Sequence, residues 1–207
     1  MKMKLNNRKK LRARALRRMY MRAAHTAGTA RGAGSQGFVN QDTAPIIEVY
    51  DSELRHMFLD MGRHPDIETG WFGLGDVTED GTPRLLLVAG PGPKSNHQPA
   101  FFQQDTRYMD EIQHRFSFLQ MRHLMVGHSH HKMNLPRPSG KDVDTMFSTL
   151  EEMKIASMVL VIGTIEGSSM CLYPYLFKND GTYCRMQWRR IAGASPVRKM
   201  MEKWEMQ

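Results

Sequence analysis

Three histidines lie within four positions of one short segment, "VGHSHH" at residues 126–131, and "PSGKD" follows at residues 138–142. In an extended chain the side chains of His128 and His130 point to the same side, because side-chain direction repeats every two residues. Two imidazoles that converge at a strand end suit Zn2+, which binds nitrogen at about 2.0–2.1 Å. The pattern therefore predicts that His128 and His130 are zinc ligands.

A third ligand is expected from a helix that begins near Ser139. Asp142 lies in its first turn, where the helix dipole also stabilises a carboxylate. Three protein ligands leave the fourth tetrahedral position open for water, which is typical of catalytic zinc. Attack of that water on a carbonyl needs a base and a donor to the oxyanion. Ser139 is the candidate donor, and Glu68 of "DIETGWFGLG" is the candidate base.

The elements that must position these residues are expected to be short strands and amphipathic helices. Apolar and β-branched runs predict strands at 45–51, 68–77, 83–91, 123–127 and 156–165, with a hairpin over 170–191. Apolar residues spaced by three and four predict helices capped by Asp51 or Ser52 and by Asp105, a third after Pro138, and a last one at the C-terminus. The proline-rich segment 90–102 is expected to be an irregular loop. The predicted class is α+β, with a central mixed sheet flanked by helices.

Positive charge is confined to the start of the chain. Residues 1–40 hold eleven Lys or Arg and no acid, whereas residues 41–207 hold 18 basic and 21 acidic residues. We expect residues 1–43 to be a disordered basic extension, because like charges this dense repel one another. Such a segment is also typical of contacts with nucleic acid or another polyanion.

Composition indicates a soluble protein of a reducing compartment. No apolar run is long enough for a transmembrane segment, and no secretory signal is evident. The two cysteines match neither a zinc pattern nor a disulfide framework. A cytoplasmic location is therefore expected, and the Arg-rich, acid-free start leaves a mitochondrial location as the alternative.

The order of the candidate residues resembles a known motif. A Glu in an "ETG" strand, then His-Ser-His, then Pro-Ser-x-x-Asp, is similar to the JAMM motif of the JAB/MPN metallopeptidases, in their prokaryotic branch. The resemblance covers residues from about 45 to 178. It departs from the family at His131, where proline is usual, and in a gap to Ser139 that is one residue longer.

What the resemblance implies is a JAB/MPN (cytidine-deaminase-like) fold over residues 44–207, ending in a C-terminal helix, and a zinc isopeptidase. Such enzymes cleave after the C-terminal glycine of ubiquitin or a ubiquitin-like modifier, and in bacteria they accompany activating and conjugating enzymes, some in antiphage operons. By this resemblance Zn2+ is bound by His128, His130 and Asp142, Glu68 is the general acid and base, and Ser139 stabilises the tetrahedral intermediate. That Glu68 reaches the metal follows from the resemblance alone.

Other interpretations stay open. Ser139 and Asp142 are spaced as in a helix capping box, which any protein can use. The Gly-Gly tail of a sulfur-carrier protein is an alternative substrate, and a non-catalytic scaffold is a second class of function. For the modifier's extended tail, the segment containing His97, Phe101 and Phe102 is the candidate binding wall.

Overall fold

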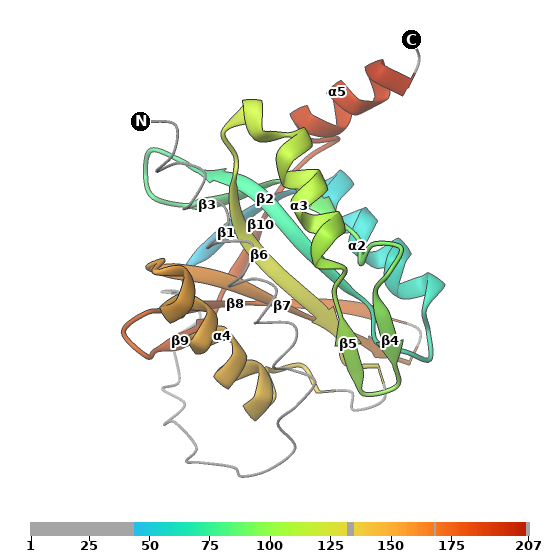
Figure 1. Ribbon diagram of the computed structural model, residues 1–207, viewed down its shortest axis with the longest axis vertical. Helices are drawn as coiled ribbons and strands as arrows, with labels where there is room; N and C mark the ends of the chain where they lie inside the picture. The colour runs from blue at the N-terminus through green and yellow to red at the C-terminus, as the bar shows by residue number, and fades with distance from the viewer. Residues whose placement is uncertain (1–43, 132–134, 168, 206–207) are drawn as a thin grey trace.

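The computed structural model describes residues 44–131, 135–167 and 169–205 (Figure 1). The basic extension expected at residues 1–43 lies outside them. Strands and helices mix along the chain without strict alternation. In chain order the elements are β1 (Ile46–Tyr50), α2 (Asp51–Arg63), β2 (Gly70–Val77), β3 (Pro83–Ala89), β4 (Asn96–Gln98), β5 (Phe101–Gln103), α3 (Thr106–Arg115), the 3-10 turn η2 (Ser117–Leu119), β6 (Arg122–Ser129), α4 (Gly140–Met153), β7 (Ser157–Glu166), β8 (Ser169–Lys178), β9 (Tyr183–Arg185), β10 (Gln187–Ile191) and α5 (Pro196–Glu205).

Eight strands form one mixed sheet in the order β10-β1-β3-β2-β6-β7-β8-β9. β2 is antiparallel to both β3 and β6, whereas β6 is parallel to β7 and β1 is parallel to β10. This confirms the predicted mixed sheet and the α+β class.

The two outermost strands are neighbours in the chain, with only Met186 between them. The Met186 N–H donates to Pro174 O at 2.8 Å, and the next N–H, of Gln187, donates to Pro45 O at 2.9 Å. The sheet is therefore curved strongly enough that its two edge strands, β9 and β10, are connected in the chain by Met186 alone. The predicted hairpin was right for β8 and β9 but wrong for residues 187–191, which pair with β1 instead of β8.

Helices cover both faces of the sheet because successive strand residues point to opposite sides. On one face, Met57 and Met61 of α2 pack against Trp71. On the other face, α4 packs on the β6 and β7 side chains, and α3 and α5 pack around the fully buried Phe72. In Figure 1, α3 crosses in front of β2 and β6 while α4 covers the opposite end of the sheet.

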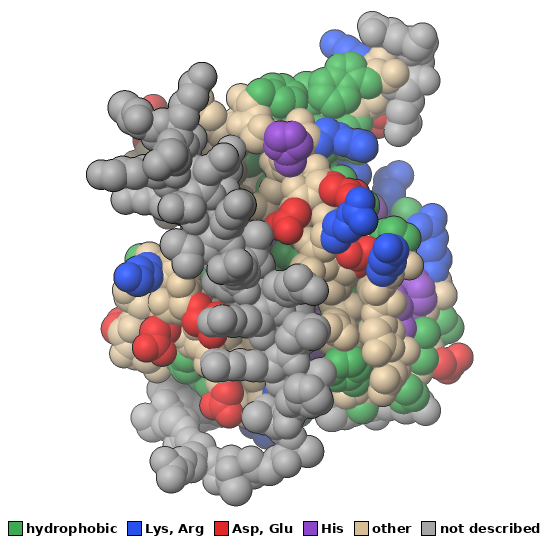
Figure 2. Space-filling view, viewed as in Figure 1, with side chains coloured by type: hydrophobic (Ala, Val, Ile, Leu, Met, Phe, Trp, Pro, Cys, Tyr) green, Lys and Arg blue, Asp and Glu red, His purple; other side chains and the backbone are tan. Residues whose placement is uncertain are grey.

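The last helix projects from the body of the molecule. Val197 in its first turn is 3% exposed, whereas Trp204 near its end is 48% exposed and lies 6.2 Å, between ring centroids, from the exposed Phe118. Figure 2 shows hydrophobic side chains gathered at this end of the molecule. None of the helices among the described residues is long and apolar enough to span a bilayer.

Two local expectations were wrong. Residues 90–102 are not all irregular, because β4 and β5 form a separate two-stranded antiparallel sheet. The prolines of this segment lie outside the paired residues, so no ladder hydrogen bond is lost to them. Helix α2 begins at Asp51, one or two residues earlier than a cap at Asp51 or Ser52 predicts, and it has no side-chain cap. The Asp51 carboxylate instead binds Arg190 at 2.8 Å, and the Ser52 hydroxyl donates to Glu53. The expected cap at Asp105 is confirmed.

Candidate metal centre

His128, His130 and Asp142 come together where β6 ends beside the start of α4. The Nε2 atoms of the two histidines are 2.8 Å apart. The Asp142 carboxylate lies 3.3 Å from His128 Nε2 and 3.4 Å from His130 Nε2. Ligand atoms around a tetrahedral zinc ion are separated by about 3.3 Å, given bonds of about 2.0–2.1 Å. Two of the three separations match that value, so the three residues form a group that could hold a metal ion.

Each of two ligands is oriented by a further hydrogen bond. The His130 ring is 1% exposed, and its Nδ1 lies 3.0 Å from Leu135 O. Because a carbonyl oxygen can only accept, Nδ1 carries the proton and Nε2 keeps its lone pair for a metal. The Asp142 carboxylate accepts hydrogen bonds from both the backbone N–H and the hydroxyl of Ser139, each at 2.7 Å. These contacts are the support that metal ligands require.

Ser139 is the N-cap of α4 and forms a complete capping box with Asp142. Its hydroxyl proton is directed to Asp142 Oδ2, so in this arrangement it orients a ligand. The oxyanion role expected for Ser139 requires that proton to turn toward a substrate, and it stays a prediction.

The electrostatics of the group favour a cation. Burial by itself raises the pKa of the Asp142 carboxyl, but His128 and His130 outweigh burial and hold that pKa well below its usual range. Burial lowers the pKa of His128, and Asp142 outweighs it and raises that pKa. A proton and a metal ion compete for the same His128 nitrogen, so metal binding is expected to release a proton.

Glu68 lies on the same face of the sheet as the histidines. Gly70 is paired with His128, and the adjacent Thr69 O accepts from the Ser129 N–H at 2.9 Å, so residues 68–70 run beside residues 128–130. Glu68 is 4% exposed, and no hydrogen bond or ion pair joins its carboxylate to another described residue. Burial raises the pKa of this carboxyl, against the opposing charges of His128 and His130.

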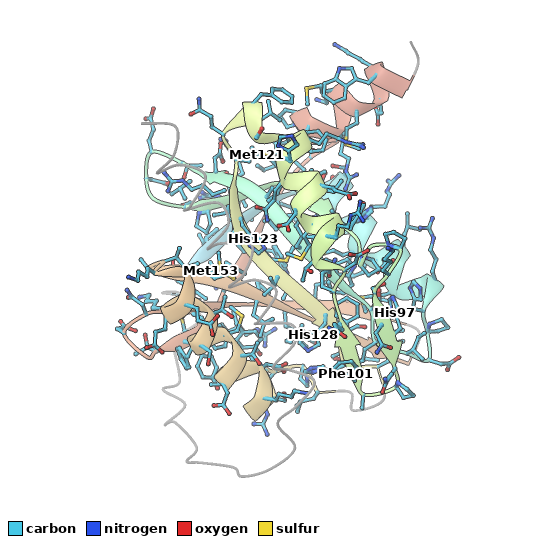
Figure 3. All side chains as sticks on the ribbon, viewed as in Figure 1. His97, Phe101, Met121, His123, His128 and Met153 are labelled. Atoms are coloured by element: carbon cyan, nitrogen blue, oxygen red, sulfur yellow. The ribbon has the colours of Figure 1, made fainter. Side chains whose placement is uncertain are left out.

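A cavity opens in front of these residues, between α4 and the β4–β5 hairpin. Figure 3 shows His128 and Phe101 close together at this end of β6. Phe101 from the hairpin faces Lys141 from α4, whose Nζ lies 5.2 Å from the ring centroid. Apolar and polar side chains share the lining: Glu68, Ala100, Phe101, Phe102, Val126, Gly127, His128, His130, Ser139, Lys141, Asp142, Thr145, Met146 and Leu160.

The three residues expected to bind substrate do not share one environment. Phe101 and Phe102 line the cavity, but His97 is not among its lining residues. The His97 ring instead contacts the backbone of Glu68, with Nδ1 2.8 Å from Glu68 O. The contacts of His97 therefore favour a structural role over the predicted binding of substrate.

Two features of the site were missed in the sequence: the lining residue Lys141, and a close approach of the hairpin at Gly70. Lys141 lies in the first turn of α4, where the helix dipole disfavours a cation. A lysine at such an unfavourable position in the sequence could have indicated a functional residue. Gly70 has no room for a side chain, because an added Cβ would overlap the Phe102 ring. A glycine inside a strand pattern often indicates that another segment approaches the backbone closely, and Gly70 is such a glycine.

His131 contacts the residue that lies between His128 and His130. Its Nε2 is 2.8 Å from Ser129 Oγ, and the same hydroxyl accepts from the Thr69 N–H at 3.0 Å. His131 thus supports the contact between the Glu68 and His128 segments.

No protein-family profile matches this chain, and no curated protein sequence matches it. Among solved structures, it is similar to a protein from Desulfitobacterium hafniense, with 18% identity and a TM-score of 0.56 over 72% of this chain and 94% of that one. A protein from Salinibacter ruber is 20% identical, with a TM-score of 0.48 over 72% of this chain and 95% of that one. At this identity the Desulfitobacterium likeness concerns the fold alone.

Proposed function

We propose that this protein is a zinc-dependent isopeptidase of the JAB/MPN type that cleaves after the C-terminal glycine of a ubiquitin-like modifier. The observation that carries the proposal is the Glu68 carboxylate, buried and without a partner among the described residues, in the same cavity as His128, His130 and Asp142. A buried acid with a raised pKa beside a potential metal group is the combination that hydrolysis requires.

The donor set favours zinc as the metal. Two imidazole nitrogens and one carboxylate oxygen suit Zn2+, and three protein ligands leave one position open. When bound, zinc supplies a Lewis acid that lowers the pKa of a coordinated water to about 7.

The protein's own residues then move the protons. The Glu68 carboxylate is the group that accepts a proton at Oε as water attacks, and it later returns that proton to the leaving amine. Its burial raises its pKa toward the range in which both transfers are efficient. Apolar lining from Phe101, Met146 and Leu160 limits bulk water around the reacting groups.

The β4–β5 hairpin is consistent with a substrate that binds in an extended conformation. Among the described strands β4 and β5 pair only with each other, and the Glu68 N–H already occupies the outer edge of β4, so the β5 edge beside Phe101 is the one to which an extended tail can add. Glycines at the scissile bond would fit between Phe101 and α4, where larger side chains meet the Phe101 ring and Lys141. Activating and conjugating enzymes of the same pathway, and a polyanion for the basic extension, remain the proposed partners.

The test combines metal analysis with cleavage of a ubiquitin-like protein whose Gly-Gly terminus is fused to a reporter. We expect one zinc per chain and cleavage after the second glycine, lost with a chelator and restored by zinc. Asp142→Asn should lose both zinc and cleavage. Asp144→Asn is the matched control, because Asp144 is an exposed residue of the same helix. A zinc-loaded protein that leaves every such fusion intact would falsify the proposal.

A further inference from the structure

We propose that His97 is a positioning residue that holds the backbone of Glu68, and through it the direction of the Glu68 carboxylate. This inference rests on the proposed function, because it assigns His97 a part in the same reaction. It replaces the substrate-binding role that the sequence suggested for His97.

Two successive residues of β4 hold both backbone groups of Glu68. The Glu68 N–H donates to Gln98 O at 2.9 Å, and Glu68 O lies 2.8 Å from His97 Nδ1. Because the carbonyl oxygen has no proton, His97 Nδ1 must be the donor. Glu68 lies two residues before Gly70, the first residue of β2, so the pairing of β2 itself does not hold these two backbone groups. The β4–β5 hairpin does so instead.

The His97 ring is itself fixed on several sides. It stacks on His64 with ring centroids 4.8 Å apart, and Phe102 meets it edge-on at 5.4 Å. Its Nε2 lies 2.8 Å from the hydroxyl of Ser95, which lies 2.7 Å from Gly92 O. A ring held in this way keeps its Nδ1–H directed at Glu68. In Figure 3, His97 lies on the hairpin beside the end of β6 that carries His128.

The packing of Phe102 on Gly70 links this contact to the sheet. An added Cβ at Gly70 would overlap the Phe102 ring, so only glycine lets the hairpin lie this close. The β4–β5 hairpin thus packs on β2 at Gly70, and this contact places His97 within hydrogen-bond distance of Glu68 O. Because a catalytic group displaced by about 1 Å loses about 10²-fold in rate, this support matters for turnover.

Two amide variants separate the two ring nitrogens. In His97→Asn the side-chain amide lies near the Nδ1 position and can still donate to Glu68 O. In His97→Gln it lies near the Nε2 position and reaches only Ser95. We expect His97→Asn to keep kcat within a few-fold, and His97→Gln and His97→Leu to lose kcat about 10²-fold with KM unchanged.

Controls separate positioning from general damage. His114→Gln removes an exposed histidine from α3 and should change neither kcat nor stability. Zinc content and the urea midpoint should be equal in the Asn and Gln variants, so that a difference in kcat is not a difference in folding. A rise in KM in all His97 variants, with kcat retained, would overturn the inference in favour of substrate binding.

A spectroscopic test does not depend on turnover. Nitrogen-15 NMR of the imidazole identifies which ring nitrogen carries a proton. We expect a protonated Nδ1 at His97, which is required for donation to Glu68 O. A ring protonated only at Nε2 overturns the inference, even if the protein cleaves nothing. If Nδ1 is protonated and no Gly-Gly fusion is cleaved, the contact stands and the proposed function fails.

Discussion

Glu53 and Glu68 are both buried acids, but their surroundings differ completely. Glu53, in α2, is 0% exposed and accepts hydrogen bonds from the hydroxyls of Ser52 and Ser195 and from the Val88 N–H. The Arg198 guanidinium donates to both of its oxygens, at 3.1 and 3.0 Å. This cluster joins α2, β3 and α5. Its carboxylate has no capacity left for chemistry.

Glu68 is 4% exposed and has none of these partners. Its backbone is held by the hairpin, while its carboxylate faces a cavity shared with two histidines and an aspartate. Burial raises the pKa of this carboxyl, because its charge faces the cavity and no donor among the described residues compensates the desolvation. The difference favours a structural role for Glu53, whose carboxylate is fully hydrogen-bonded, and makes Glu68, whose carboxylate opens to a cavity, the candidate for a reacting group.

The largest effect is expected at Glu68. Glu68→Gln keeps the size of the side chain and removes the proton acceptor, so kcat should fall about 10²–10⁴-fold. Zinc content should be unchanged, because Glu68 is not part of the ligand group. Unfolding in urea should show no loss of stability, since none of the residues in the described part of the chain donates a hydrogen bond to this carboxylate. Loss of zinc from this variant would contradict the assigned role.

Glu53→Gln should have the opposite profile. Breaking a buried ion pair leaves the Arg198 charge uncompensated, and the free energy of unfolding should fall by about 3–5 kcal/mol in urea denaturation. Activity per folded molecule should be unchanged. The double variant Glu53→Gln with Arg198→Met removes both charges and should recover part of the stability. If Glu53→Gln reduces kcat of the folded protein, the assignment of a purely structural role to Glu53 is contradicted.

His123 tests whether an unpartnered buried atom always indicates chemistry. Its Nδ1 is buried without a partner among the described residues, and burial lowers the pKa of His123 to about 4 from 6.5. Between these values the unfolded chain binds a proton that the folded protein does not, so the free energy of unfolding should decrease as pH falls, by up to about 3 kcal/mol. We expect His123→Leu to reduce this decrease.

The measurement for His123 is urea unfolding at pH 7 and pH 4.5, with the wild-type and variant proteins compared at each pH. His123 lies away from the metal group, toward the other end of β6 from His128 (Figure 3). Activity at pH 7 should therefore be retained. An equal pH dependence in both proteins would show that His123 does not carry this proton linkage.

The smallest effect is expected at Ser139, whose hydroxyl is already engaged with a partner. Ser139→Ala removes an N-cap contact and should lower the free energy of unfolding by about 1 kcal/mol. Zinc affinity should weaken about 10-fold, because Asp142 loses one orienting donor. Ser139→Thr retains the hydroxyl and is the control. If turnover at saturating zinc instead falls by about 10²-fold or more, the oxyanion role is supported.

Local patterns predicted most elements correctly. The spacing of Met146 and Leu150 predicted the buried face of α4, and Asp105 predicted the start of α3. Both depend on residues within one or two turns, where helix geometry alone decides which side chains share a face. The approach of His128 to His130 was predictable for the same reason, because residues two apart in an extended chain point to the same side.

Other features depend on residues distant in the chain. The β4–β5 hairpin lies in a proline-rich segment, and its seat on Gly70 is visible only when both segments are placed together. The parallel pairing of β10 with β1 joins positions about 140 residues apart, which no local pattern encodes. The change of partner at Met186 left no signal in the hydrophobic alternation of residues 184–188.

The sequence by itself determined which side chains are available for chemistry: two histidines in strand spacing, an aspartate in a helix's first turn and a glutamate two residues before a glycine. Only the tertiary structure decided that His128, His130 and Asp142 meet, that the Glu68 carboxylate is left without a partner among the described residues, and that His97 holds its backbone. The physical reason is that side-chain type and local spacing are properties of a few neighbouring residues. Desolvation and hydrogen-bond satisfaction, by contrast, depend on every segment that packs around an atom.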